Sequence, residues 1–158
     1  MNIKGGTQMF EFKDFDYLTD GEIDLRIEEK TPADEEKGFV PEYDYKITLH
    51  NSNENIGAID IRIGHNENTY YGGNIGYSIE ATYRGNNYAS KACKIIKDVA
   101  IAHGMNRLII SCNPDNYPSR KTCEKAGFKL KEIADLPSYH ELYQVGKRQM
   151  CIYEWILE

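Results

Sequence analysis

The chain has 158 residues, of which 41% are hydrophobic and 28% charged, and its formal net charge is -6 at pH 7. This length suits one compact domain, so we expect residues 1–158 to form a single domain. Acidic residues are spread along the chain, which argues against a nucleic-acid-binding protein, because such proteins gather positive charge for the phosphate backbone. No apolar run approaches the roughly 20 residues that a membrane-spanning helix needs, so we expect no association with a membrane.

The first residues and the cysteines give expectations about the compartment. The N-terminus carries neither the apolar segment of a secretory signal nor an Arg-rich amphipathic pattern, so we expect a cytoplasmic protein. The four cysteines form no Cys-x-x-Cys pair and no cluster with histidine at metal-ligand spacing. We therefore expect reduced, buried thiols, with neither a disulfide framework nor a metal site.

The first half of the chain predicts strands. Residues 1–21 give no clear pattern, but residues 22–30 alternate apolar and charged side chains as a half-buried strand does. Residues 31–42 hold two prolines and a charge run, which is typical of a solvated loop or a broken helix. Residues 43–49 and 56–63 then predict an antiparallel hairpin across a polar turn.

The second half predicts helices between strands. Gly104 and Gly127 are suited to end helices, and Pro118 is suited to the first turn of one. In chain order we expect a strand, a helix, a strand, a helix and two strands over residues 72–80, 89–103, 108–110, 118–126, 128–133 and 149–157. The predicted fold class is therefore α/β (α+β), with a mixed, mostly antiparallel central sheet and flanking helices.

The junction from Glu80 to Ala89 connects a predicted strand to the long predicted helix. Free backbone N–H groups and the positive end of the helix dipole can hold a phosphate group at such a junction. Arg84 adds positive charge, and Gly85 lets a ligand approach the backbone closely. Asn86 and Asn87 can adopt left-handed conformations more readily than most residues. The junction therefore indicates a diphosphate-binding loop, although Gly-Asn-Asn also suits an ordinary tight connection.

At this loop the chain resembles the GNAT acetyltransferases. The family's acetyl-CoA loop carries the pattern R/Q-x-x-G-x-G/A after a strand, and Arg84, Tyr88 and Ala89 fall on it. Asn87 stands where the family usually has glycine. Because asparagine is the non-glycine residue that most readily accepts a positive φ, we expect the loop conformation to survive.

A second motif strengthens the resemblance. Asn116 and Ser119 resemble the family's N-x-x-S element, and residues 124–128 resemble its E-K-x-G-F element. In the family this region lies near the pantetheine arm or the sugar-phosphate of CoA. Asn116 is also suited to cap a helix and Gly127 to end one, and these structural roles are compatible with the functional ones.

The resemblance implies an N-acetyltransferase that uses acetyl-CoA as co-substrate on a GNAT-like fold. In the family the thioester lies between two splayed parallel strands, and an amine attacks its carbonyl directly. The backbone groups implied to pair with the pantetheine amides belong to Tyr77, Ser78 and Ile79. The other residues implied to contact CoA are Arg84, Gly85, Asn86, Asn87, Tyr88, Ala89, Asn116 and Ser119.

An alkylamine with a pKa of about 10 is mostly protonated at pH 7, so a base or a water chain must remove its proton. Glu80, at the end of the strand beside the loop, is our first candidate, although it can equally end the sheet or pair with a cation. Glu67, Glu141 and His140 are alternatives from neighbouring loops.

The proton donor to the departing thiolate is a separate question. Many family members place a tyrosine seven residues after the asparagine of the second motif, where this chain has Cys123. Free cysteines are mostly buried small apolar residues, so we favour a packing role for Cys123. Tyr139 or Tyr143 can substitute as the donor, because a thiolate needs little help in leaving.

The acceptor is expected to be an amine. Tyr70 and Tyr71, with Tyr139 and Tyr143, can form an aromatic wall that holds a cationic amine. Glu67 and His140 are further candidates for binding the acceptor. A small molecule is slightly favoured over a protein N-terminus, and we expect a monomer or a homodimer.

Two other function classes compete with this interpretation. A non-catalytic acyl-CoA-binding or regulatory module would keep the loop and need no acid or base. A dinucleotide or nucleotide-triphosphate enzyme is excluded by the absence of G-x-G-x-x-G and G-x-x-x-x-G-K-[ST].

Overall fold

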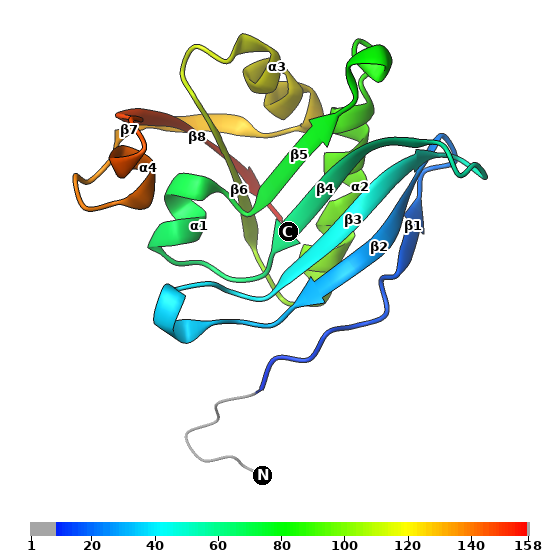
Figure 1. The fold of residues 1–158 in the computed structure, drawn as a ribbon, viewed down its shortest axis with the longest axis horizontal. Coiled ribbons are helices and arrows are strands. Elements are labelled where there is room, and N and C mark those ends of the chain that lie inside the picture. Colours follow the sequence, from blue (N-terminus) through cyan, green and yellow to red (C-terminus); the bar gives the residue numbers. More distant parts are fainter. Residues whose placement is uncertain (1–8, 158) are drawn as a thin grey trace.

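The computed structural model describes residues 9–157 and contains two antiparallel sheets with helices beside them (Figure 1). The strands are β1 (Tyr17–Thr19), β2 (Ile23–Thr31), β3 (Glu42–Leu49), β4 (Asn55–Arg62), β5 (Ile75–Ile79), β6 (Arg107–Cys112), β7 (Lys129–Asp135) and β8 (Gln149–Ile156). The helices are α1 (Glu67–Gly72), α2 (Tyr88–Ala102), α3 (Tyr117–Ala126) and α4 (Glu141–Gln144), with 3-10 turns η2 (Glu35–Lys37) and η3 (Ala81–Tyr83). The predicted α/β fold is confirmed.

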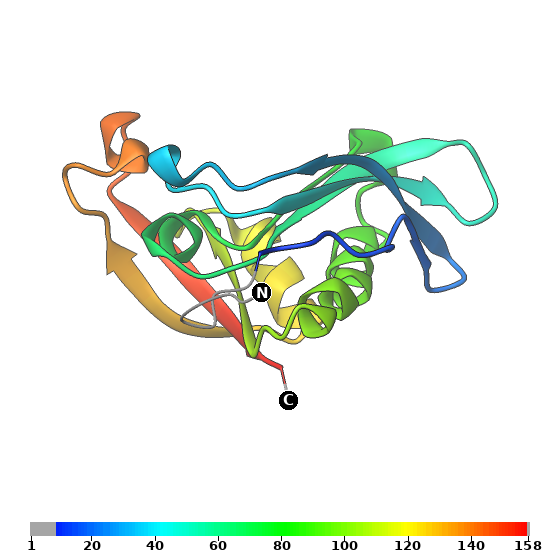
Figure 2. The same ribbon diagram turned by 90° about the horizontal axis from the view of Figure 1, so that it is seen from below.

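The larger sheet has the strand order β1-β2-β3-β4-β5, and the smaller one has the order β6-β8-β7. Alternating side chains of β2, β3 and β4 are buried on the face that packs against α2 (Figure 2). The α2 residues that meet them include Ile96 and Val99, which are fully buried at helical spacing. The predicted hairpin is confirmed, because β3 and β4 pair antiparallel from Glu42 opposite Arg62 to Thr48 opposite Asn55.

The two sheets meet at Asn74, immediately before β5. The Asn74 backbone N–H donates to Ile109 O at 2.7 Å, and the Ile109 N–H donates to Asn74 Oδ1 at 2.9 Å. The Asn74 amide nitrogen donates to the carbonyls of Arg62 and Gly64, at 3.0 and 2.8 Å. Beyond this point, no β ladder joins β5 to β6 within residues 9–157, and Figure 1 shows the two strands diverging. A cavity lies between the two sheets at this place.

Several elements differ from the sequence-based expectation. Residues 67–72 form α1, because Asn66 and Thr69 make a reciprocal capping box. The predicted strand from residue 72 therefore begins later, at Ile75, and Gly72 ends a helix instead. The region without a clear pattern contains β1, and its residues 1–8 lie outside the described part. The polar connection after β7 contains α4.

No helix within residues 9–157 is both long and apolar enough to cross a membrane.

Candidate functional site

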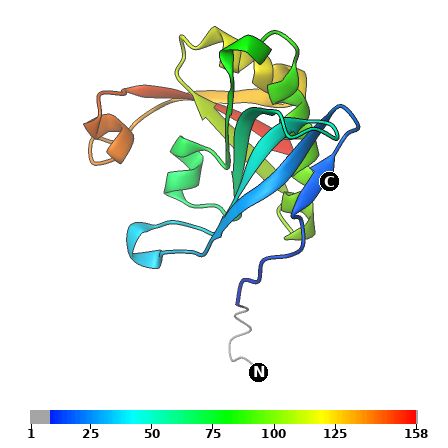
Figure 3. The ribbon, with the colours of Figure 1, turned by 45° about the vertical axis from the view of Figure 1, so that its right-hand side comes forward.

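A cavity of about 800 Å³ occupies the cleft between β5 and β6 and continues to the start of α2 and to α3. Its wall contains every residue that the resemblance places against CoA except Asn86. The Asn86 side chain instead donates to Tyr83 O at 3.1 Å, so it stabilises the loop from outside. Figure 3 shows the segment after β5 and helix α3 side by side at one end of the molecule.

The start of α2 presents unused backbone donors to the cavity. Gly85 and Asn87 have φ angles of 91° and 64°. Asn87 therefore adopts the expected left-handed conformation, whereas Asn86 does not have a positive φ. Within residues 9–157, the N–H groups of Gly85, Asn86, Tyr88 and Ala89 donate to no protein acceptor. The N-cap side chain of Asn87 makes no capping bond either. Such a helix end favours a bound anion.

Three cationic side chains stand around these donors. Arg84 is exposed, and its Nε donates to Ile79 O at 2.8 Å, which fixes the guanidinium beside the end of β5. Lys121 and Lys125 of α3 also line the cavity. Lys125 Nζ donates to Asn87 Oδ1 at 2.7 Å. Neither lysine was among the predicted site residues, although Lys125 is the second residue of the E-K-x-G-F element and Lys121 lies one helical turn before it.

Helix α3 is connected to β5 across the cavity wall. Asn116 Oδ1 accepts the backbone N–H of Ser119 at 3.2 Å, which confirms the expected helix cap. Ser119 Oγ lies 2.8 Å from the Tyr77 hydroxyl. Burial raises the pKa of Tyr77, so its hydroxyl stays protonated at neutral pH. The phenol therefore supplies a fixed polar group to this wall.

The four cysteines, Cys93, Cys112, Cys123 and Cys151, are free and buried, as expected. Cys123 is fully buried and does not line the cavity, whereas Cys112 does. The hydrogen bond that Cys123 makes with Cys112, together with burial, raises the pKa of Cys123. A thiol with a raised pKa gives up its proton less readily, so the environment of Cys123 favours packing over proton donation.

Glu80 lies outside the cavity wall. It is exposed and begins the turn η3, where its backbone N–H donates to Ile56 O at 2.8 Å and its carbonyl accepts from Tyr83 N. These contacts give Glu80 a structural role at the end of β5. Its assignment as a base stays a prediction.

The predicted acceptor residues gather around α1 and α4. The Tyr139 hydroxyl donates to Glu67 Oε2 at 2.6 Å. The ring of Tyr71 packs edge to face against those of Tyr70 and His140, with centroids 5.4 and 5.3 Å apart. The structure therefore brings these five residues together, but none of them lines the cavity.

The remaining candidates near α4 also lie apart from the cavity. His140 is buried and caps α4, because its Nδ1 accepts the N–H of Leu142 at 3.1 Å. Glu141 begins α4. The Tyr143 ring lies 3.8 Å from the guanidinium carbon of Arg148. The cavity end nearest to α1 is lined instead by Gly72, Gly76, Lys147 and Met150, none of which was among the predicted site residues.

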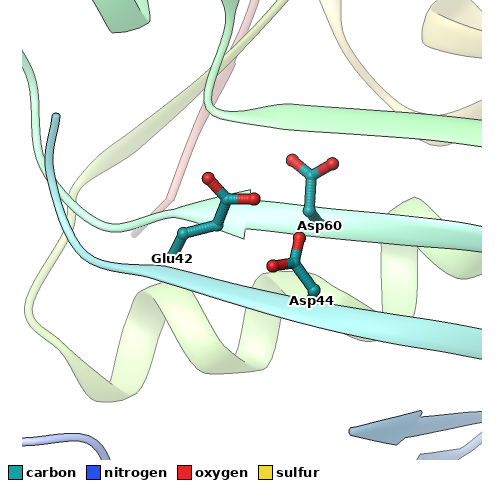
Figure 4. Close-up of side chains that lie close together, drawn as sticks. All are labelled: Glu42, Asp44 and Asp60. Atoms are coloured by element: carbon teal, nitrogen blue, oxygen red, sulfur yellow. The ribbon is translucent and has the colours of Figure 1, made fainter. Parts of the chain in front are cut away.

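The face of the larger sheet opposite α2 carries a carboxylate cluster, formed by Glu42, Asp44 and Asp60 (Figure 4). One oxygen of each lies within 4.8 Å of the others, and Arg62 lies 3.3 Å from Glu42 and 3.5 Å from Asp60. Burial and the neighbouring Glu42 raise the pKa of Asp44 to about 7. Burial likewise raises the pKa of Asp60. Arg62 compensates part of this charge without an ion, and the expectation of no metal site stays a prediction.

Comparison with known proteins gives a family and a relative. The family described as Acetyltransferase (GNAT) domain matches residues 8–129. The uncharacterized N-acetyltransferase YnaD of Bacillus subtilis (strain 168) is 28% identical over 132 residues, which cover 76% of each chain.

Two solved structures share the fold. RimL, a ribosomal L7/L12 alpha-N-protein acetyltransferase in complex with coenzyme A, has a TM-score of 0.61 at 16% identity, over 86% of this chain and 94% of its own. The microcin C7 self immunity acetyltransferase MccE, in complex with acetyl-CoA and AMP, has a TM-score of 0.58 at 22% identity. That match covers 73% of this chain and 61% of the MccE chain.

Proposed function

The chain belongs to the GNAT acetyltransferase family and is an acyltransferase with acetyl-CoA as co-substrate, and we propose that it acetylates the primary amine of a small molecule. The observation that carries the proposal is the cavity between the diverging strands β5 and β6, which ends at the free N–H groups of α2. Residues 1–158 are proposed to act as a single domain.

The CoA diphosphate is proposed to bind at the start of α2. Four backbone N–H groups without protein acceptors, at Gly85, Asn86, Tyr88 and Ala89, can donate to its oxygens. The positive charges of Arg84 and of the two α3 lysines complement the same anion. Asn87 contributes through its backbone conformation and by positioning Lys125.

The pantetheine arm is proposed to lie along β5. Tyr77, Ser78 and Ile79 line the cavity, and the edge of β5 that faces β6 has no ladder partner within residues 9–157. Asn116 and Ser119 form the opposite wall. An arm bound this way directs the thioester away from α2, where a backbone N–H can polarise its carbonyl for attack by an amine.

The acceptor is proposed to enter from the end of the cavity beside α1. The aromatic group around Tyr71, with Glu67 and Tyr139, lies next to that end, since α1 finishes at the cavity residue Gly72. Aromatic faces and a carboxylate suit a cationic amine. A protein N-terminus is the alternative acceptor, because RimL is a protein acetyltransferase.

Thiol release tests this function. The purified protein is incubated with acetyl-CoA and amines in four groups: polyamines, amino acids, aminoglycosides and peptides with free N-termini. We expect CoA release with a small-molecule amine and, by calorimetry, binding of acetyl-CoA without any acceptor.

The possible outcomes separate the candidate functions. Turnover only with peptides would replace the small molecule by a protein N-terminus. Binding of acetyl-CoA without turnover in any group would favour the non-catalytic module. Absence of binding to any CoA species would contradict the proposed diphosphate site.

A further inference from the structure

The charged side chains in the wall of the cavity between β5 and β6 are all positive. Arg84, Lys121, Lys125 and Lys147 line this cavity, and no aspartate or glutamate of residues 9–157 does. The first three lie around the free N–H groups at the start of α2, where they complement the proposed CoA diphosphate. That anion does not account for Lys147, which comes from the residues before β8.

Contacts with the aromatic group on α1 fix the segment that carries Lys147. The Lys147 backbone N–H donates to Leu142 O at 3.0 Å. Leu142 packs in the same apolar cluster as Tyr70 and Tyr71 of α1. Met150, three residues after Lys147, is buried in that cluster and also lines the cavity. Lys147 therefore belongs to the end of the cavity that is assigned to the acceptor.

The positive charge of Lys147 forms no ion pair in the described part of the chain. Its Nζ donates to the amide oxygen of Asn113, immediately after β6, at 3.3 Å. This bond uses one of the three donors of the ammonium group, so the others can bind a ligand. Because the side chain is half-buried, its charge interacts more strongly with an anion than it would in bulk water.

We infer that the acceptor carries an anionic group, a carboxylate or a phosphate, in addition to its amine, and that Lys147 binds this group. The inference rests on the proposed acetyl transfer and narrows the class of its acceptor. An acceptor with positive charge alone, such as a polyamine, would meet only like charges in the described cavity wall. An amine that also carries an anion pairs with Lys147 while its amino group faces the thioester.

The aromatic group around Tyr71 is compatible with such an acceptor. Glu67 and Tyr139 lie outside the cavity wall, and the Tyr139 hydroxyl donates to the Glu67 carboxylate at 2.6 Å. This carboxylate can attract the ammonium group of the acceptor as it enters beside α1. Lys147 then receives the anion inside the cavity. Opposite charges along the entry path therefore favour a small molecule that carries both signs of charge.

Pairs of substrates that differ by one anionic group test the acceptor class. Each amino acid of the panel is compared with the amine that remains when its carboxyl group is removed, as in alanine and ethylamine. Ethanolamine phosphate is compared with ethanolamine, which distinguishes a phosphate from a carboxylate. For the best pair we expect kcat/KM to be about 10-fold higher for the anionic member. This ratio corresponds to about 1.4 kcal/mol, close to the lower limit for a hydrogen bond to a charged group.

Three variants test whether Lys147 causes this preference. Lys147→Met removes the charge and keeps a long side chain, so we expect the ratio of the two kcat/KM values to fall about 10-fold. Lys147→Arg keeps the charge and should retain the preference. Lys129→Met removes an exposed positive charge from β7, outside the cavity, and is the matched control. The KM for acetyl-CoA and the melting temperature should be the same in all three variants and the wild type.

The outcomes separate the parts of the inference. A wild-type protein that acetylates the amine without an anion equally well or better in every pair would overturn the anionic acceptor and leave acetyl transfer intact. This comparison needs no variant, so it holds even where Lys147→Met does not fold. An unchanged preference in Lys147→Met, or a raised KM for acetyl-CoA in that variant alone, would overturn the assignment of Lys147. A wild-type protein that acetylates no amine would contradict the proposed function itself.

Discussion

The two ends of the cleft are built in different ways. The end assigned to CoA comes from two short continuous segments, residues 80–89 and 116–127, and uses mainly backbone groups. The end assigned to the acceptor is assembled from β5, α1, β8 and the residues before β8, which are far apart in the sequence. A binding site formed by the backbone of one continuous segment can be recognised from a sequence motif. A site formed by side chains of distant segments cannot.

The strongest disruption should come from Asn74, where both ends of the cleft depend on one side chain. Asn74→Ala removes partners from two carbonyls and from the N–H of Ile109. Buried groups left unsatisfied cost about 1–3 kcal/mol each, so we expect a loss of about 3 kcal/mol or more in the free energy of unfolding.

Urea unfolding followed by circular dichroism measures this loss. Asn53→Ala, in the exposed turn between β3 and β4, serves as the control and should leave stability unchanged. If Asn74→Ala were as stable as that control, the sheets would not be held together at this point.

A smaller effect, confined to the CoA end, is expected for Arg84→Ala. Loss of one charge-assisted contact of about 1.4 kcal/mol corresponds to an approximately 10-fold higher KM for acetyl-CoA. The KM for the amine should not change, because Arg84 lies at the opposite end of the cavity from Gly76. Steady-state kinetics with each substrate varied in turn measures both constants.

Lys94→Ala removes an exposed positive charge from α2 outside the cavity and is the matched control. An unaltered KM for acetyl-CoA in Arg84→Ala would remove the guanidinium from the binding site. A raised KM for the amine alone would place Arg84 at the acceptor end of the cavity instead of the CoA end.

The smallest effect concerns the backbone at Asn87, whose φ is 64°. Alanine tolerates this conformation poorly, so Asn87→Ala should lower the free energy of unfolding by about 1 kcal/mol. Asn87→Gly should be nearly neutral, because glycine adopts the conformation freely and loses only the exposed contact with Lys125. Thermal denaturation ranks the two variants, and the reverse order would show that the side-chain contact outweighs the backbone conformation.

The sequence was sufficient to predict those features that depend on residues close together in the chain. The β3–β4 hairpin, the helix stops at Gly104 and Gly127, and the left-handed Asn87 all follow from residue types within a few positions. The family motifs identified most of the cavity wall in the same way.

Features that depend on tertiary pairing were not predictable. Asn74 was not singled out in the sequence, yet it is fully buried and bonds to both sheets. Residues 67–71 were not predicted to be helical, but the capping box at Asn66 produces a helix there.

The missing ladder between β5 and β6 has a thermodynamic consequence. With the CoA arm in the proposed place along β5, we expect its amides to bond to the open edge of that strand, so that donor binding stabilises the folded protein. At a free concentration 100 times the dissociation constant, the gain is about 2.7 kcal/mol. We therefore expect the melting temperature to rise with the concentration of acetyl-CoA.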